Sequence, residues 1–281
     1  MQQGLLGAIL KNRTATAGLA ITGLVLLAIG PGVALSPYSA TTMDFANLLS
    51  PPSLVHPFGT DSFGRDVLTR VLIGARISLA ISATGVAAAA LLGGSSGIAS
   101  AWYGGWVDNG LMRICDLIFS FPSFVLALFL TIVLGSGVPV VAGAIALVYL
   151  PLFARLTRNM ALLVKEEPFI QAARLMAQPT WRILAREIFP NISAPVLVQT
   201  SIGVAFGVVI EAGLSFIGLG VQPPLPSLGT IMADGREYFQ RGPWVLTLTG
   251  LFISVALLGL NLLGDGLRDL TDPRLRDRLG P

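Results

Sequence analysis

Residues 77–107 form an unbroken run of 31 residues that contains no Asp, Glu, Lys or Arg. A helix needs about 20 apolar residues to cross the hydrocarbon core of a bilayer, so this run is long enough to span a membrane. Of the 281 residues in the chain, 53% are hydrophobic and 12% are charged, against roughly 25% charged in a soluble domain. The alternating pattern of an outer-membrane barrel is absent from the sequence. We therefore expect an all-α, polytopic membrane protein.

Five other apolar runs bring the expected number of transmembrane helices to six. They cover residues 17–35, 117–134, 140–153, 192–210 and 244–263. The first run follows Lys11 and Arg13 and could be a signal peptide, but it is long for one and no A-x-A cleavage site follows it. We expect an uncleaved first helix. Pro122 should kink the third span or lie near its start.

The distribution of positive charge predicts the orientation of the chain. Six spans place both termini on one side of the membrane. That side holds 13 of the 18 Lys and Arg residues, and the other side holds Arg65, Arg70, Arg76, Arg236 and Arg241. Lys and Arg concentrate in cytoplasmic loops, so we expect both termini in the cytoplasm.

The chain shows no sign of a second globular domain. Residues 1–76 comprise an N-terminal segment, the first helix and a proline-rich outer loop, residues 77–268 hold the other five spans, and residues 269–281 form a basic tail. Within the core, residues 165–190 mix charge with helical periodicity, and Pro179 divides them. This pattern predicts two short amphipathic helices outside the bilayer, on the cytoplasmic side.

The outer loop contains a compact motif of glycines and charges over residues 56–66. Its members are Gly59, Asp61, Gly64, Arg65 and Asp66. The glycines permit turns, and the charged side chains could lock the loop through ion pairs. We expect a folded loop rather than a substrate site. His56 is expected to be structural, because the chain offers no second histidine, and Cys115 is its one cysteine.

Two acidic residues lie at the ends of predicted spans, where ionisable groups are costly and often functional. Glu211 is expected near the outer end of the fifth span, where water reaches it. It is either a carboxylate of the transport pathway or gate, or an interfacial residue that pairs with a loop charge. Asp116 lies nearer the cytoplasmic end, and Arg113 is one helical turn away and can pair with it.

The cytoplasmic insert reads E-P-F-I-Q-A-A-R-L-M-A from Glu167 to Ala177. It resembles the E-A-A-x-x-x-G loop of bacterial ABC importer permeases, which forms a coupling helix that sits in a cleft of the ATPase subunit. Here glutamine replaces the family's glutamate and alanine replaces its glycine, although alanine tolerates positive φ poorly. The residues that the resemblance assigns to coupling are Gln171, Ala172, Ala173, Arg174, Ala177 and Pro190.

Four further blocks are similar to the dipeptide, oligopeptide and nickel permeases, within that family. They cover residues 56–66, 104–108, 214–224 and 261–269. The resemblance implies a type I ABC importer permease fold and import of di- or oligopeptides by alternating access. Nickel, a metal chelate or glutathione are the alternative substrates. The rigid outer loop with Gln222, Pro223 and Pro224 would form part of the mouth that meets a solute-binding protein.

The resemblance also implies the partners and the location. The partners are a second homologous permease, two cytoplasmic ABC ATPase subunits, an extracytoplasmic solute-binding protein and membrane lipid, without nucleic acid. The location is the bacterial or archaeal plasma membrane. Neither Lys11 nor Lys165 lies in a P-loop motif, so ATP and Mg²⁺ are expected in the ATPase subunits. We expect no catalytic residue, cofactor or metal in this chain.

Two other classes of protein remain as alternatives at this point. An ion-coupled secondary transporter would need charged or broken helices in paired repeats, and the apolar spans show no such pairing. An intramembrane enzyme would need a catalytic group deep in the membrane, and Asp116 has no deep partner in the sequence pattern.

Overall fold

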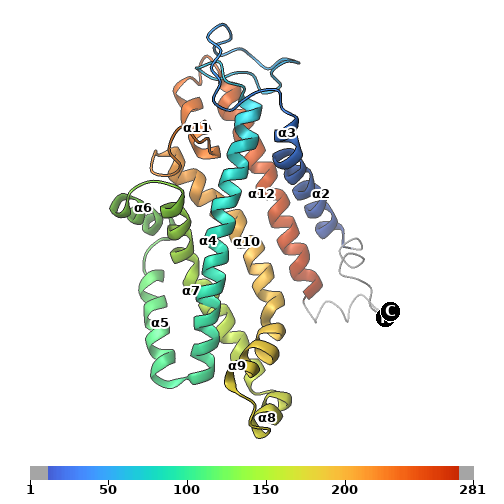
Figure 1. Cartoon of the computed structure of the whole chain (residues 1–281), viewed down its shortest axis with the longest axis vertical. Coiled ribbons are helices and arrows are strands. Elements are labelled where there is room, and N and C mark those ends of the chain that lie inside the picture. The colour runs from blue at the N-terminus through green and yellow to red at the C-terminus, as the bar shows by residue number, and fades with distance from the viewer. Residues whose placement is uncertain (1–11, 272–281) are drawn as a thin grey trace.

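The computed structural model describes residues 12–271, which form a long bundle of helices (Figure 1). The all-α prediction is confirmed, since the described residues contain an isolated bridge between Thr60 and Asp66 but no strand. In chain order the elements are α2 (Arg13–Leu27), η1 (Ala28–Gly32), α3 (Val33–Leu35), α4 (Val67–Tyr103), α5 (Gly105–Phe119), α6 (Ser123–Leu134), α7 (Val138–Lys165), α8 (Pro168–Leu175), α9 (Thr180–Ile183), η2 (Leu184–Ile188), α10 (Phe189–Phe216), α11 (Leu228–Glu237) and α12 (Pro243–Thr271). Elements η1 and η2 are π-helical turns.

Five helical runs among these residues are long and apolar enough to cross a membrane. They are Arg13–Leu35, Val67–Tyr103, Val138–Lys165, Thr180–Phe216 and Pro243–Asp269. Helices α5 and α6 qualify as a pair, bent by 88° at the break between them. The prediction of six spans is confirmed if this bent pair is counted as one.

The bend between α5 and α6 has a chemical cause in the sequence. Pro122 occupies the N-cap position of α6. Proline has no N–H group and disfavours helical geometry in the residue before it, so a helix cannot run straight through this point. The predicted effect of Pro122 is therefore confirmed.

Two predicted boundaries are wrong. Helix α7 does not end at Phe153 but continues to Lys165, and it includes Arg155 and Arg158. The second amphipathic helix of the insert is also not separate, because α9, η2 and α10 run on as one span. Pro190 does not stop this span, because it follows the π-helical turn η2, and a local π adjustment of this kind accommodates the missing N–H group.

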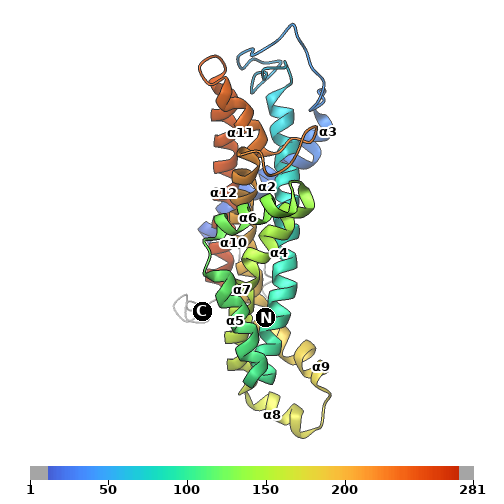
Figure 2. The same cartoon turned by 90° about the vertical axis from the view of Figure 1, so that its left-hand side faces the viewer.

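The bundle has two distinct ends (Figures 1 and 2). The loop end carries residues 36–66 and α11, and the insert end carries α8 and α9. Helix α2 begins, and α12 ends, toward the insert end, where the side chain of Asn12 donates to Asp269 over 3.4 Å. Lys11 and residues 272–281, which contributed to the predicted charge bias, lie outside the described residues.

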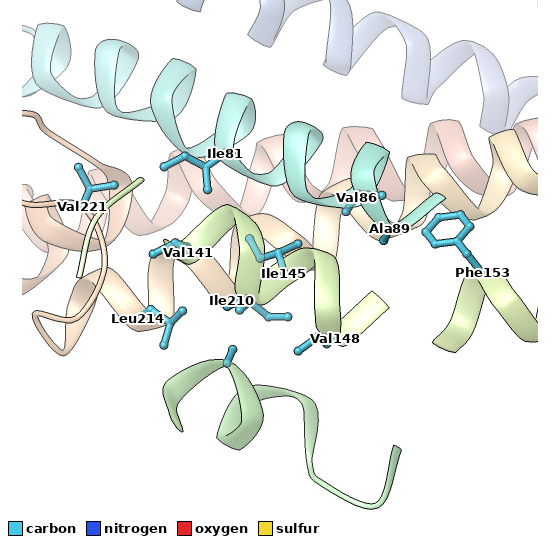
Figure 3. Close-up of a cluster of buried hydrophobic side chains, with 12 residues drawn as sticks. Ile81, Val86, Ala89, Val141, Ile145, Val148, Phe153, Ile210, Leu214 and Val221 are labelled. Atoms are coloured by element: carbon cyan, nitrogen blue, oxygen red, sulfur yellow. The ribbon is translucent and has the colours of Figure 1, made fainter. Parts of the chain in front are cut away.

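Helices α4 and α7 pack so closely that their backbones nearly touch. A Cβ atom added at Gly93 of α4 would collide with the carbonyl oxygen of Leu150, and one added at Gly97 would collide with that of Ala154. Small residues at such spacing let two membrane helices approach and gain van der Waals contact. The resulting core joins α4, α6, α7 and α10, and Figure 3 shows Ile145 of α7 between side chains of α4 and α10.

The close contact predicts that a glycine-to-alanine substitution lowers stability at Gly93 but not at Gly143. Gly93→Ala should lower the free energy of unfolding by about 1–3 kcal/mol, because the new methyl group meets backbone that cannot move aside. Gly143→Ala in α7 is the control, since a Cβ there meets nothing within 4 Å. Thermal unfolding of the detergent-solubilised protein measures both. Equal melting temperatures for the two variants would contradict the account of this contact.

Candidate functional site

Helix α8 forms the tip of the insert end, and its boundaries are set by local chemistry. Pro168 opens the helix at its first position, where proline is well tolerated. The helix closes with Ala177 in the left-handed region at a φ of +50°. There the N–H groups of Ala177 and Gln178 donate to the carbonyl oxygens of Arg174 and Ala173 over 2.9 and 3.1 Å. The backbone at Ala177 therefore adopts the geometry that favours glycine, which is the residue that the family motif has at this position.

One face of α8 is fastened to the ends of α4 and α7 and to the span that follows α8. Ile170 and Ala173 are buried in a cluster that includes Ala101 of α4, Ala161 of α7 and Ile188 of η2. The guanidinium of Arg174 stacks on the ring of Trp102 at 4.2 Å, a favourable cation–π distance. These contacts hold α8 against the helices that carry it.

Lys165, the last residue of α7, strengthens the same junction. Its Nζ atom donates to the carbonyl oxygens of Ala101 and Trp102 over 2.8 and 3.0 Å. These carbonyls belong to the last turn of α4, where the helix dipole favours a positive charge. The lysine therefore ties the end of α7 to the end of α4.

The opposite face of α8 is exposed and partly apolar. Leu175 and Met176 are 88% and 68% exposed, and Gln171 and Ala172 are also exposed. Ala172 and Ala173, which the sequence motif places together, thus lie on different faces of α8, one exposed and one buried. Pro190, the last residue of the predicted motif, is exposed in the first turn of α10.

Helix α5 is clamped to α7 by two ion pairs near the insert end. Arg158 of α7 donates from two nitrogens to the two carboxylate oxygens of Asp108, each over 2.6 Å, and Ser100 of α4 bonds to the same carboxylate. Arg155, which precedes Arg158 in α7, pairs with Asp116 of α5. Bidentate guanidinium–carboxylate pairs fix orientation as well as distance, so α4, α5 and α7 form one connected block.

The predicted pairing of Asp116 with Arg113 is wrong. Asp116 bonds to Arg155, which lies 39 residues away in sequence. The sequence showed Arg155 and Arg158 only as the end of a span, because nothing local reveals which helix will pack beside them. A pathway role for Asp116 stays a prediction, and the residue is exposed in this chain.

The charged motif at the loop end forms a network of ion pairs, as predicted. Arg65 and Arg70 both donate to Oδ2 of Asp61, over 2.7 and 2.9 Å. Arg70 also reaches Asp234 of α11 over 3.1 Å. Asp234 was missed by sequence reasoning, because it lies 164 residues from Arg70 and belongs to no local motif. The network ties the loop to α4 and α11.

Asp66 links this loop to the start of α4. Its Oδ2 atom accepts hydrogen bonds from the N–H and the hydroxyl of Thr69 over 2.8 and 2.7 Å, which caps the helix. Its Oδ1 atom lies 2.9 Å from Nδ1 of His56, and the Tyr38 ring lies beside that imidazole at 4.7 Å. The prediction of a structural histidine is confirmed.

The glycines of the motif are required by close contacts and by backbone geometry. Gly59 and Gly64 have φ values of +71° and +72°. A Cβ at Gly64 would collide with the carbonyl oxygen of Asp44, and one at Gly59 would lie 2.7 Å from Nε1 of Trp244. The loop can therefore fold this tightly only with glycine at both positions.

Two loop-end carboxyls outside the spans have shifted pKa values. The side chain of Asn47, with help from the N–H of Ala46, donates to Asp44 and lowers the pKa of that carboxyl. Partial burial raises the pKa of Asp234, and the opposing attraction of Arg65 is smaller. Asp44 therefore stays charged into more acidic solution than Asp234 does.

Glu211 lies five residues from the loop end of α10, which fits its predicted place near the end of the fifth span, but the prediction that water reaches it is wrong. It is 0% exposed, so water does not reach it in this conformation, and it makes no ion pair with any described residue. The nearby loop is exposed at Gln222, Pro223 and Pro224. Gln222 donates from Nε2 to the carbonyl oxygens of Gly218 and Gly220 over 3.1 and 3.2 Å, which stiffens the turn.

The fold and these two ends define a multi-pass α-helical membrane protein with a partly apolar helix presented outside the spans. Comparison with known sequences makes the class specific. The chain belongs to the family of binding-protein-dependent transport system inner membrane components, whose sequence profile matches residues 93–277.

Individual proteins that resemble this chain include transport permeases of known name. The dipeptide transport system permease protein DppC of Alkalihalophilus pseudofirmus is 39% identical over 268 residues, which cover 95% of this chain and 88% of that protein. The glutathione transport system permease protein GsiD of Escherichia coli O6:K15:H31 is 40% identical over 267 residues, with the same coverage. A chain of the inward-facing MetNI methionine ABC transporter shares the fold, with a TM-score of 0.56 at 19% identity over 72% of this chain and 96% of that one.

Replacing Ala177 or Ala172 with glycine should change the free energy of unfolding in opposite directions, because only Ala177 has positive φ. Ala177→Gly should raise the free energy of unfolding by about 1 kcal/mol, because glycine adopts positive φ without strain. Ala172→Gly, inside α8, should lower it by about 1 kcal/mol through helix propensity. The rate of hydrogen exchange at the amides of residues 173–178 measures the effect of each substitution on α8. Loss of protection in both variants would contradict the strain at Ala177.

Proposed function

We propose that this chain is the transmembrane permease subunit of an ATP-driven ABC importer that takes up di- or oligopeptides. The observation that carries the proposal is the construction of α8. One of its faces is anchored to α4, α7 and the α9–η2–α10 span by Ile170, Ala173 and Arg174, while its other face is exposed. A helix built in this way can receive a force from a partner and pass it to the spans.

The proposed orientation places the insert end, with both termini, in the cytoplasm. Positive side chains favour the cytoplasmic side of a membrane. The described residues at or near the insert end include Arg13, Arg155, Arg158, Lys165, Arg174, Arg182, Arg186 and Arg268. The family name places the protein in an inner membrane, and we infer the plasma membrane of a bacterium or archaeon.

The proposed partners follow from this arrangement. Two ABC ATPase subunits would bind ATP and Mg²⁺ and dock on α8, where Leu175 and Met176 offer an apolar surface. A solute-binding protein would deliver substrate to the loop end, and a homologous permease would complete the pathway. This chain would carry no catalytic residue, because hydrolysis takes place in the ATPase subunits. No nucleic acid takes part.

In the proposed cycle, ATP binding draws the ATPase subunits together and moves α8. The motion reaches α4 and α7 through Arg174 and Lys165, and it reaches α5 through the pairs that Arg155 and Arg158 make. The bend at Pro122 is the natural hinge between this block and α6. Alternating access then results from movement of the block relative to the other spans.

Peptides are the proposed substrates because several relatives at about 40% identity are named for peptide transport. Glutathione is the second candidate, since GsiD relatives match equally well. Nickel and metal chelates stay further alternatives. Ion-coupled transport and intramembrane catalysis are set aside, because the family is one of binding-protein-dependent transport.

Docking on α8 predicts that a charge on its exposed face uncouples the importer. Ala172→Glu should reduce ATP-driven uptake at least tenfold, because burying a charge without a partner in the docked interface is costly. The protein should still fold, since the side chain points outward. Ala172→Ser, which stays small, should keep uptake near the parent level. The assay uses the complete complex in proteoliposomes with its binding protein, dipeptides, oligopeptides, glutathione and Ni²⁺ chelates.

The buried neighbour of Ala172 separates docking from folding. Ala173→Glu places a charge inside the cluster around Ile170 and should lower stability as well as uptake. Full uptake by Ala172→Glu would refute α8 as the docking helix. Uptake of peptide by the parent complex that does not require ATP would refute the proposed function itself.

A further inference from the structure

Glu211 is a buried carboxylate that has no cation to balance it among the described residues, and the proposed cycle does not use it. It lies in α10, five residues before the end of that helix at the loop end. A buried charged or polar group is tolerated only where hydrogen bonds replace water. The partners of Glu211 therefore indicate what the carboxylate is for.

The first partner connects Glu211 to the start of the loop that follows α10. The hydroxyl of Ser215 donates to Oε1 of Glu211 over 2.6 Å. The same hydroxyl oxygen accepts the N–H of Val221 over 3.0 Å. Glu211 thus fixes the serine, and the serine holds the backbone of the loop. The side chain of Val221 packs into the central core beside Leu214 and Ile81 (Figure 3).

The Glu211 carboxyl group also lies near the other end of the same loop. Its Oε2 atom has no hydrogen bond of normal geometry, but the hydroxyls of Ser78 and Ser227 interact more weakly with the carboxyl group. Ser78 belongs to α4, and its oxygen accepts the N–H of Leu228, the first residue of α11, over 3.3 Å. Ser227 is the N-cap of α11. The carboxylate therefore also reaches the point where α11 begins.

We propose that Glu211 is a positioning residue that latches residues 217–228 to the membrane core, by way of Ser215 at one end of the loop and Ser78 at the other. The latch fixes the exposed turn with Gln222 and Pro223, and it seats the start of α11 against α4. The role of this turn as the mouth that meets the binding protein rests on the proposed function. The latch does not depend on the proposed function.

Two cysteine reporters test the two arms separately. In a Cys115→Ala background, which removes the native cysteine, Val221→Cys reports on the Ser215 arm and Leu228→Cys on the Ser78 arm. Both native side chains are at most 2% exposed, so a hydrophilic maleimide should label them slowly in the intact complex. The complex is held in lipid nanodiscs, where reagent reaches both faces and orientation does not matter.

The latch predicts a specific pattern of labelling rates. Ser215→Ala should accelerate labelling at residue 221 by about ten- to a hundredfold, with little change at residue 228. Ser78→Ala should accelerate labelling at residue 228 and spare residue 221. Glu211→Ala should accelerate both. Glu211→Gln should keep residue 221 slow, because its amide oxygen still accepts from Ser215.

Ser82→Ala is the matched control for loosening of the whole fold. Ser82 is a buried serine one turn further along α4, and its hydroxyl donates to the carbonyl oxygen of Val204 over 2.7 Å, away from the latch. It should leave both reporters slow. Slow labelling in every variant would overturn the latch, as would equal acceleration of both reporters in every variant, including Ser82→Ala.

Uptake measurements give the consequence for transport and separate the two proposals. Ser215→Ala should raise the concentration of loaded binding protein needed for half-maximal uptake by about tenfold, while Ser82→Ala should not. An unchanged concentration would overturn the assignment of this loop to the mouth. Absence of ATP-driven uptake in the parent would instead refute the proposed function and leave the labelling result standing.

Discussion

The contact between α4 and α7 is the constraint on which the rest of the structure depends. In a membrane, lipid tails compete with apolar side chains, so helices associate through close packing and hydrogen bonds. Gly85, Gly93 and Gly97 bring the backbone of α4 against α7 along most of the bundle. Both helices are longer than a bilayer requires. Together they run toward both ends and give every other element a fixed surface.

Each end of this pair carries a different kind of chemistry. At the insert end, Lys165 and Arg174 fasten α8 to the last turn of α4, and Arg158 fastens α5 to α7. At the loop end, Arg70 in the first turns of α4 joins the loop to α11. Charges are costly inside the hydrocarbon region and are favoured where water or a partner charge meets them. The ion pairs therefore lie toward the ends, and the centre is held by packing and by hydroxyl hydrogen bonds such as that of Ser82.

The sequence predicted the features that depend on local composition. Charge-free runs located the spans, Pro122 located the bend, and the loop-end motif predicted that Asp61 and Arg65 would pair. It could not predict features that depend on which helices become neighbours. Asp234 and Arg155 find partners far away in sequence, and α11 packs against α10 at Ala212 and Ser215, a contact of which the sequence gives no sign. That Ala173 is buried and Ala172 exposed likewise depends on where α8 packs.

Whether α4 and α7 move as one body is the most direct test of this account. Spin labels at Leu91 of α4 and Leu163 of α7, both exposed, would report the distance between them in the complete complex, without nucleotide and with ATP trapped by vanadate. A second pair at Leu163 and at Leu258 of α12 would report on movement against the other spans. We predict that the first distance stays constant while the second changes. A change in the first distance as large as that in the second would contradict the account.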